Sequence, residues 1–247
     1  MTQRKPLVAA NWKMNGSKAL VDDMTHSLAV VDFTAVDVMI CPPATLLPLF
    51  PQGTAIALGG QNLSQYDAGA YTGELSASLL LQAGARYVLV GHSERRSLFS
   101  EDDDILLAKV QQAVATGLIP VFCVGENLQQ RQQEKTTEVL AKQLAAVYAS
   151  HPELLAKSVI AYEPVWAIGT GEAATPEQAQ QAHAAIRQLL ARYDTVAASK
   201  VRILYGGSVN ASNAAALFNE ADIDGGLVGG ASLKPAEFLE ICRSAKD

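Results

Sequence analysis

The segment from residue 159 to residue 171 decides how the rest of the sequence is interpreted. It reads Val159-Ile160-Ala161-Tyr162-Glu163-Pro164-Val165-Trp166-Ala167-Ile168-Gly169-Thr170-Gly171. Its first four residues form a continuous apolar run, which is typical of a strand covered on both faces in a parallel sheet. Glu163 ends that run. Pro164 and the glycines prevent the strand from continuing and would make a poor helix, so the sequence predicts an apolar loop after Glu163.

Seven further apolar runs of this kind recur along the chain, at 7–10, 36–40, 55–58, 87–90, 119–124, 201–205 and 226–228. Stretches with helical spacing lie between them, at 17–31, 101–116, 127–150, 176–193, 210–219 and 235–245. Eight strands alternating with helices over 247 residues predict an α/β fold, a single-domain (β/α)8 barrel of parallel strands covering residues 1–247. A doubly wound open sheet is the alternative, but no G-x-G-x-x-G follows the first run.

Composition limits the possible partners and cofactors. The net charge of −6 argues against a nucleic-acid-binding face, and no apolar run approaches the roughly 20 residues that a membrane helix needs. The N-terminal residues lack the pattern of a signal peptide, so we expect a cytoplasmic protein. Cys41, Cys123 and Cys242 are far apart and form no CxxC pair. They predict buried thiols, and neither a metal nor another cofactor is expected.

In such a barrel the active site forms at the carboxyl ends of the strands. The first run leads into Asn11-Trp12-Lys13, whose first and third side chains project to the same side if the strand persists that far. Lys13 could be a solvated surface residue, or it could hold an anionic ligand against the field of an acidic protein.

The fourth run leads into Gly91 and His92. His92 could be a structural residue, but residues 91–96 resemble a strand-to-helix turn whose backbone N–H groups could hold a neutral imidazole. Glu94 could be a surface acid or a partner of Lys13 or Arg95. Glu163 could likewise be paired or functional, and the apolar loop after it could be a water-excluding lid or an aromatic loop buried against a helix or a partner.

Glycine pairs follow the last two runs, at Gly206-Gly207-Ser208 and Gly229-Gly230. Any tight turn uses such pairs, but two at successive strand ends are typical of a phosphate site formed by backbone N–H groups. The segment from 61 to 76 is too long and aperiodic for a simple connection. Its two tyrosines and few charges favour an ordered loop, for which a second subunit is the natural partner.

Five segments together resemble the triosephosphate isomerase family, and the resemblance covers essentially the whole chain. They are residues 11–15, 91–96, 161–171, 205–209 and 227–233. The resemblance implies a TIM barrel that interconverts dihydroxyacetone phosphate and D-glyceraldehyde 3-phosphate in glycolysis and gluconeogenesis. It also implies that Glu163 transfers a proton through an enediolate, that neutral His92 is the electrophile, and that Lys13 and Asn11 assist.

The resemblance further assigns roles outside the catalytic set. Glu94 would contact the catalytic residues without touching the substrate. The phosphate would be bound by Gly169, Ser208, Gly229 and Gly230. The lid would consist of Pro164, Val165, Trp166, Ala167, Ile168, Thr170 and Gly171 together with Gly169. Tyr71, Thr72 and Glu74 resemble the loop through which members of the family form homodimers.

Two departures from the family pattern are visible. Glu172-Ala173-Ala174 replaces the usual residues at the carboxyl end of the lid, which could change the rate of lid motion. Gly226 stands where a larger residue is common, so we expect a void or looser packing there. A phosphate-binding barrel lyase or synthase, and a barrel without catalysis, are the alternatives. Neither would need Asn11, Lys13, His92 and Glu163 together.

Overall fold

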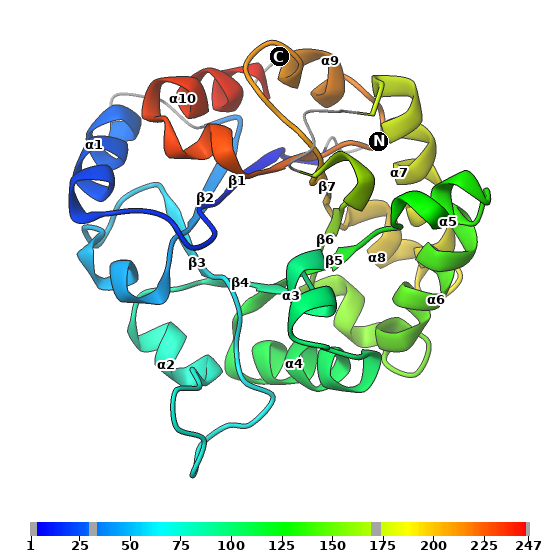
Figure 1. The fold of residues 1–247 in the computed structure, drawn as a ribbon, viewed down its shortest axis with the longest axis horizontal. Coiled ribbons are helices and arrows are strands. Elements are labelled where there is room, and N and C mark those ends of the chain that lie inside the picture. Colours follow the sequence, from blue (N-terminus) through cyan, green and yellow to red (C-terminus); the bar gives the residue numbers. More distant parts are fainter. Residues whose placement is uncertain (1–3, 30–33, 169–173, 246–247) are drawn as a thin grey trace.

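A computed structural model describes residues 4–29, 34–168 and 174–245. In this part of the chain, eight parallel strands close into a barrel in sequence order, and β8 pairs with β1 (Figure 1). The strands are β1 (Leu7–Asn11), β2 (Asp37–Cys41), β3 (Ala57–Gly60), β4 (Tyr87–Val90), β5 (Ile119–Val124), β6 (Val159–Tyr162), β7 (Ile203–Tyr205) and β8 (Gly225–Val228). The predicted (β/α)8 barrel is therefore confirmed, because an open sheet would leave β1 and β8 unpaired.

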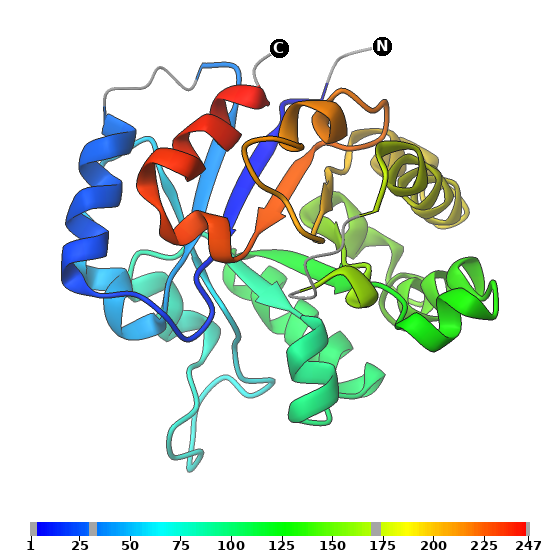
Figure 2. The same ribbon diagram turned by 45° about the horizontal axis from the view of Figure 1, so that its top comes forward.

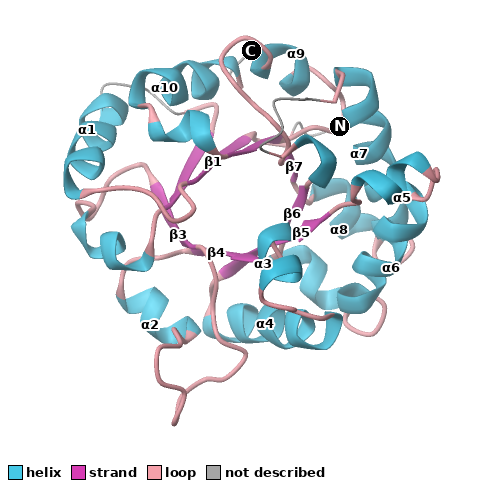
Figure 3. Ribbon diagram, in the orientation of Figure 1, coloured by secondary structure: helices cyan, strands magenta, loops and turns pink. Residues whose placement is uncertain are grey.

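Helices form a ring outside the strands, as Figure 3 shows. The α-helices are α1 (Lys18–Ala29), α2 (Ala77–Gln82), α3 (Ser93–Leu98), α4 (Asp103–Thr116), α5 (Leu128–Gln132), α6 (Thr136–Tyr148), α7 (Pro176–Leu190), α8 (Thr195–Lys200), α9 (Ala214–Phe218) and α10 (Pro235–Ser244). Short 3₁₀ helices are η1 (Ala44–Leu49), η2 (Pro152–Lys157), η3 (Val165–Ala167) and η4 (Gly230–Leu233). Pro176 and Pro235 both occupy the first turn of a helix, as predicted.

Both faces of each strand are buried, which explains why the apolar runs are continuous. In β1, Leu7 and Ala9 belong to the cluster inside the barrel, whereas Val8 and Ala10 belong to the larger cluster between strands and helices. This alternation follows from the period of two residues in a strand. The three cysteines are buried free thiols, as expected.

Some predicted helix boundaries were wrong. The stretch 127–150 forms two helices, α5 and α6, because Glu134 between them has a left-handed φ of 56°. The stretch 210–219 is helical only from Ala214, since the Asn210 side chain accepts the backbone N–H groups of Ser212 and Asn213 in a local turn. The short helices α2 and α8 were not predicted, because six residues are too few to show a helical period.

The expected void at Gly226 is absent. A Cβ atom at this position would lie 3.1 Å from two ring atoms of Phe218, so the phenyl ring from α9 already fills the space. The glycine and the aromatic ring are therefore complementary in this chain.

The segment between β3 and α2 protrudes from the body of the barrel (Figure 2). Its base is closed by a hydrogen bond from the backbone N–H of Ser64 to the carbonyl of Leu75. At its tip, the rings of Tyr66 and Tyr71 stack at 4.1 Å. The loop is therefore ordered by its own contacts, although both tyrosines remain more than 40% exposed. None of the helices in the described part of the chain has the length and apolar character to cross a bilayer.

Candidate active site

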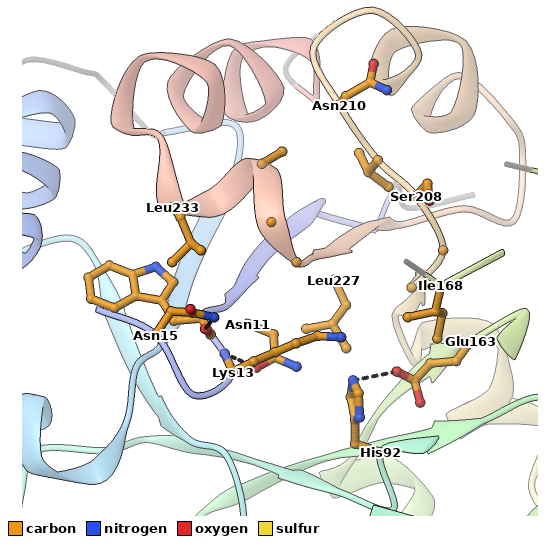
Figure 4. Close-up of a pocket in the computed structure, with 17 residues that line it drawn as sticks. Asn11, Lys13, Asn15, His92, Glu163, Ile168, Ser208, Asn210, Leu227 and Leu233 are labelled. Atoms are coloured by element: carbon orange, nitrogen blue, oxygen red, sulfur yellow. Dashed lines mark hydrogen bonds and ion pairs between the residues drawn. The ribbon is translucent and has the colours of Figure 1, made fainter. Parts of the chain in front are cut away.

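A cavity of about 360 Å³ lies at the carboxyl ends of the strands. Eight of the predicted site residues line it together, namely Asn11, Lys13, His92, Glu163, Ile168, Ser208, Gly229 and Gly230. Figure 4 shows Asn11, Lys13, His92 and Glu163 pointing toward one another from separate strand ends. The barrel thus collects in one space residues that are up to about 220 positions apart in the sequence.

The end of β1 supplies Asn11 and Lys13. The Oδ1 atom of Asn11 accepts the backbone N–H of Lys13 at 3.0 Å, and Lys13 adopts a left-handed φ of 52°. A β-strand cannot continue through that conformation, so the strand ends here and the lysine turns toward the cavity. The ammonium group pairs with Oε1 of Glu94 at 2.5 Å. Glu94 is therefore the half-exposed partner of Lys13, which was one of the predicted alternatives.

His92 caps the amino end of α3, as the predicted strand-to-helix turn requires. Its Nδ1 atom accepts the backbone N–H of Glu94 at 3.2 Å. Because an N–H group can only donate, Nδ1 carries the lone pair and the ring proton lies on Nε2. Nε2 is 3.0 Å from Oε1 of Glu163, so His92 presents a donor to the cavity.

Glu163 follows the last residue of β6, and its side chain is only 3% exposed. One carboxylate oxygen contacts His92, and the other accepts the backbone N–H of Ser93 at 2.9 Å. Neighbouring glycines give the residue its space. A Cβ at Gly125 would overlap the carbonyl oxygen of Glu163, and a Cβ at Gly206 would lie 3.0 Å from its Cγ.

The pKa of His92 reflects two opposing influences. Burial lowers it, because the charged imidazolium loses hydration, and so does the charge of Lys13, but the carboxylates of Glu163 and Glu94 together raise it, so that the net shift of the His92 pKa is upward. The hydrogen bond from the Glu94 backbone opposes protonation at Nδ1, because a proton there would face another N–H. The upward shift therefore depends on contact with Glu163 and would weaken if the two groups separated.

Glycine turns after β7 and β8 form the opposite wall. Among the described residues, no hydrogen-bond acceptor is found for the backbone N–H groups of Ser208 and Gly230. A Cβ at Gly230 would meet nothing within 4 Å, so no side chain stands between this backbone and the cavity. Free N–H groups at two adjacent strand ends can bind an anion.

The described part of the predicted lid, Pro164–Ile168, is held at several points. Trp166 donates its indole N–H to Glu126 at 3.0 Å and lies under the guanidinium of Arg131 at 4.6 Å. The Ser208 hydroxyl donates to the carbonyl of Ala167 at 2.8 Å, and Ile168 lines the cavity. Trp166 thus packs against α5, as one of the two predicted alternatives has it, while Ile168 faces the cavity. A water-excluding role of the segment stays a prediction.

A family model described as triosephosphate isomerase matches residues 6–245 of this sequence. The chain belongs to the triosephosphate isomerase family.

Individual relatives with this name match over nearly the same length. The triosephosphate isomerase of Alkalilimnicola ehrlichii is 53% identical over 248 residues, which cover 98% of this chain and 99% of the relative. The enzyme of that name from Paracidovorax citrulli is 50% identical, with 99% of this chain and 100% of the relative covered. The triosephosphate isomerase of Alcanivorax borkumensis is 49% identical, with 98% of this chain and 99% of the relative covered.

Sequence reasoning missed two residues of this triosephosphate isomerase family member that hold the lid segment. Glu126 is fully buried, and its carboxylate accepts hydrogen bonds from Tyr162 and Trp166. Tyr205 accepts the backbone N–H of Ala174 at 3.2 Å, at the other end of the lid. Glu126 follows β5 by two residues, so the rule that selected acids at other strand ends would have found it. Tyr205 opens the family segment 205–209, but as the last residue of an apolar run it resembled an ordinary core residue, and no role was predicted for it.

Several predicted residues lie elsewhere. Tyr71, Thr72 and Glu74 belong to the protruding loop, and Glu74 lines a second groove rather than the cavity that contains Glu163. Gly169, Thr170, Gly171, Glu172 and Ala173 lie outside the described residues. Within the described ranges, no group of three or more His, Cys, Asp or Glu side chains could hold a metal ion.

Proposed function

We propose that this member of the triosephosphate isomerase family interconverts dihydroxyacetone phosphate and D-glyceraldehyde 3-phosphate, in glycolysis and gluconeogenesis. The observation that carries the proposal is the meeting of a buried carboxylate, a neutral imidazole donor and a lysine beside free backbone N–H groups in one cavity. A carboxylate can remove a proton from carbon only if the charge that forms on the neighbouring oxygen is stabilised, and these groups supply both functions.

Glu163 acts as the base that moves the proton between adjacent carbons. Its two oxygens are held by His92 and Ser93, so substrate must replace at least one of these contacts before the carboxylate reaches carbon. Because the Glu163 carboxylate is already buried, it does not have to be stripped of water when the substrate C–H group replaces one of its hydrogen bonds. The proton taken from one carbon returns to its neighbour through the enediolate.

His92 donates from Nε2 to the oxygen that becomes negative. The Glu94 backbone keeps Nδ1 unprotonated, so the ring acts as a neutral donor. Once substrate separates His92 from Glu163, the contribution that raises the histidine pKa weakens while burial persists. A neutral donor is a better match for an enediolate than a strong acid would be, because it stabilises the oxyanion without fully protonating it.

Lys13 and Asn11 complete the electrostatic environment. Lys13 brings a positive charge into an acidic protein, and Glu94 holds its ammonium group near the cavity. Asn11 can donate through Nδ2, because its Oδ1 is already occupied by the Lys13 backbone. The phosphate is bound by the backbone N–H groups of Ser208, Gly229 and Gly230, together with Gly169 of the lid.

The lid protects the enediolate. Once formed, this intermediate can lose its phosphate, because the C–O bond can break and phosphate can leave with the electron pair. An apolar cover of Pro164–Ile168, Thr170 and Gly171 holds the substrate in the geometry that disfavours this loss and excludes water. The ties of Ala167 to Ser208 and of Ala174 to Tyr205 support such a role, since they link the segment to the phosphate wall.

The chain forms a homodimer in the cytoplasm through its protruding loop. A groove of about 730 Å³ beside the cavity is lined by apolar residues that are unusually exposed, including Met14 (96%), Leu98 (73%) and Phe99 (63%). The exposed tip with Tyr71 and Thr72 supplies a complementary apolar and polar surface, and Glu74 of the same loop lines the groove. Exposed apolar patches of this kind favour a protein partner, and a second copy offers both the loop and the groove.

The decisive experiment follows the reaction of D-glyceraldehyde 3-phosphate in D₂O by NMR, with and without a chelator. We expect dihydroxyacetone phosphate that carries deuterium at the carbon that receives the proton, because a carboxylate base exchanges with solvent, and the same rate with chelator. If the product carries no deuterium, Glu163→Ala distinguishes the two remaining mechanisms: a hydride shift would survive the substitution, whereas proton return by Glu163 without solvent exchange would be lost. Cleavage products would favour a lyase, and unchanged substrate would favour a barrel without catalysis.

A further inference from the structure

Two tyrosines from neighbouring strands hold the two ends of the lid. Tyr162, the last residue of β6, donates its hydroxyl to Glu126, which also accepts the indole N–H of Trp166. Tyr205, the last residue of β7, accepts the backbone N–H of Ala174. The amino end of the lid thus depends on one ring and the carboxyl end on the other.

The ring of His183 lies against both tyrosines. It makes an edge contact with Tyr162, with centroids 5.7 Å apart and planes at 87°, and it lies 6.3 Å from Tyr205 at 37°. The tyrosine rings are themselves 6.5 Å apart. His183 comes from α7, which begins two residues after Ala174, and it is fully buried. The three rings form one aromatic cluster behind the lid.

One face of α7 holds Asp222 through three residues. Gln180 and Arg187 bind its side chain at 2.8 and 2.6 Å, and Nδ1 of His183 lies 3.2 Å from its carbonyl oxygen. Because a carbonyl only accepts, the histidine proton lies on Nδ1. The helix is thus attached to this segment by two other side chains, and its attachment does not require a histidine.

The remaining ring nitrogen of His183 is a buried acceptor without a partner among the described residues. Burying a polar atom in this way costs free energy, so an apolar side chain would serve better if only core packing mattered. Burial also lowers the pKa of His183 to about 4, so the ring is uncharged near neutral pH. What the histidine provides is a flat, neutral ring whose orientation is set by Asp222.

We infer that His183 is a positioning residue, because its ring lies against both Tyr162 and Tyr205 and so holds in one geometry the contacts at Trp166, through Glu126, and at Ala174. If the ring is removed, each tyrosine gains room beside it, and the hydrogen bonds to Glu126 and Ala174 are no longer held in a common geometry. The inference rests on the proposed function in one respect: the consequence for catalysis requires that the lid protect an enediolate.

Three variants separate this role from a structural one. His183→Asn keeps a donor for the Asp222 carbonyl but removes the ring. His183→Phe keeps a ring between the tyrosines but removes the donor. Gln180→Ala removes two hydrogen bonds to the same Asp222 without contact to either tyrosine, and it is the matched control for a loosened α7.

Two measurements are made on each variant in the full-length protein. The first is the ¹⁵N resonance of the Trp166 indole with and without glycerol 3-phosphate, which lacks the carbonyl and cannot isomerise. The signal is assigned with Trp166→Phe. The second is the ratio of methylglyoxal to isomerised product, which reports how often the enediolate loses phosphate.

We expect His183→Asn to broaden or shift the indole signal and to raise the methylglyoxal ratio roughly tenfold. His183→Phe should restore both toward wild type, and Gln180→Ala should lower the melting temperature with both readouts unchanged. The inference is overturned if His183→Asn matches wild type in both readouts, or if Gln180→Ala changes them equally. If the wild-type chain does not isomerise triose phosphate, the proposed function fails, while the indole signal still tests the role of His183.

Discussion

Oε1 of Glu163 lies 3.0 Å from Nε2 of His92 in a buried contact. The group to which we assign the base and the group to which we assign the electrophile therefore touch each other directly. Since Oε2 accepts the Ser93 backbone N–H, the carboxylate is fixed by the first residue of α3, although Glu163 itself follows β6. This arrangement makes the position of the carboxylate, as well as its presence, a testable feature.

Glu163→Asp tests the position of the carboxylate. The shorter side chain retreats by one methylene, and a displacement of about 1 Å can lower a rate by roughly 10²-fold. We expect kcat to fall by that order while the circular dichroism spectrum and the melting temperature change little. Glu153→Asp on η2 is the matched control, because Glu153 is exposed and distant from the cavity. Near-wild-type turnover of Glu163→Asp would contradict the assignment.

His92→Gln tests the donor at Nε2. Glutamine can present an amide N–H near the same place, but it lacks the imidazole geometry set by the Glu94 backbone. Loss of one donor at a developing oxyanion lowers kcat by roughly 10²- to 10³-fold. We expect His92→Gln to retain more activity than His92→Ala, as measured by initial rates. Equal rates for the two variants would show that hydrogen-bond donation is not the role of this residue.

Lys13→Met tests the cationic contribution to anion binding. A charged hydrogen bond is worth about 1.5–3 kcal/mol, so the affinity for glycerol 3-phosphate should fall roughly ten- to hundredfold in calorimetry. Lys157→Met makes the same change of net charge on η2, an element that the catalytic cavity does not include, and should bind as wild type does. Equal affinity of Lys13→Met and wild type would assign Lys13 to the solvated surface.

Phe99→Asp tests the homodimer. Phe99 lines the groove beside the cavity and is 63% exposed, so a charge there should prevent a second copy from docking. We expect wild type to sediment as a dimer at micromolar concentration and the variant as a monomer. Leu128→Asp introduces the same charge at an exposed apolar position on α5 and should remain dimeric. A monomeric wild type would refute the proposed assembly.

The pH dependence of stability tests the buried state of His183. The ordinary pKa of 6.5 falls to about 4 on folding, chiefly through burial and also through the charge of Arg187, whereas Asp222 opposes the change. Between pH 6.5 and 4 the unfolded chain therefore binds more protons than the folded chain, and stability is lost as pH falls through this window. Each pKa unit corresponds to about 1.4 kcal/mol, so His183 contributes about 3 kcal/mol to the free energy of unfolding above this window.

His183→Phe provides the comparison, because phenylalanine keeps a ring and does not titrate. Melting temperatures measured from pH 7 to pH 4 should fall less steeply for the variant than for wild type. Parallel curves would show that His183 does not remain neutral in the folded protein. Acidic groups with lowered pKa values, such as Asp37 and Asp222, act mainly below this window and are common to both proteins.

Strand positions were the most predictable part of the fold. The runs at 87–90, 119–124 and 159–162 coincide with β4, β5 and β6, because burial of both strand faces leaves a continuous apolar pattern. The break between α5 and α6 was not predictable in the same way. The break depends on the left-handed backbone conformation of Glu134, and glutamate has no preference for that conformation from which it could be predicted.

Gly226 illustrates why local reasoning about packing fails. A glycine where the family commonly has a larger residue led us to expect a void, yet Phe218 on α9 occupies the space. Only the contact between β8 and the preceding helix decides the outcome. Similarly, Tyr205 is only the last residue of an apolar run in the sequence, and His183 is an isolated histidine within a predicted helix. Their relation to the lid exists only because β6, β7 and α7 pack side by side.

The sequence by itself determined the order of the strands, the family, and the candidate residues at the strand ends, because each of these depends on local patterns and short motifs. The tertiary structure decided that Glu94 pairs with Lys13, that the Glu94 backbone sets the proton of His92, and that Glu126 and Tyr205 bind Trp166 and Ala174. Those relations depend on distances and directions between residues from different strands, which only closure of the barrel specifies.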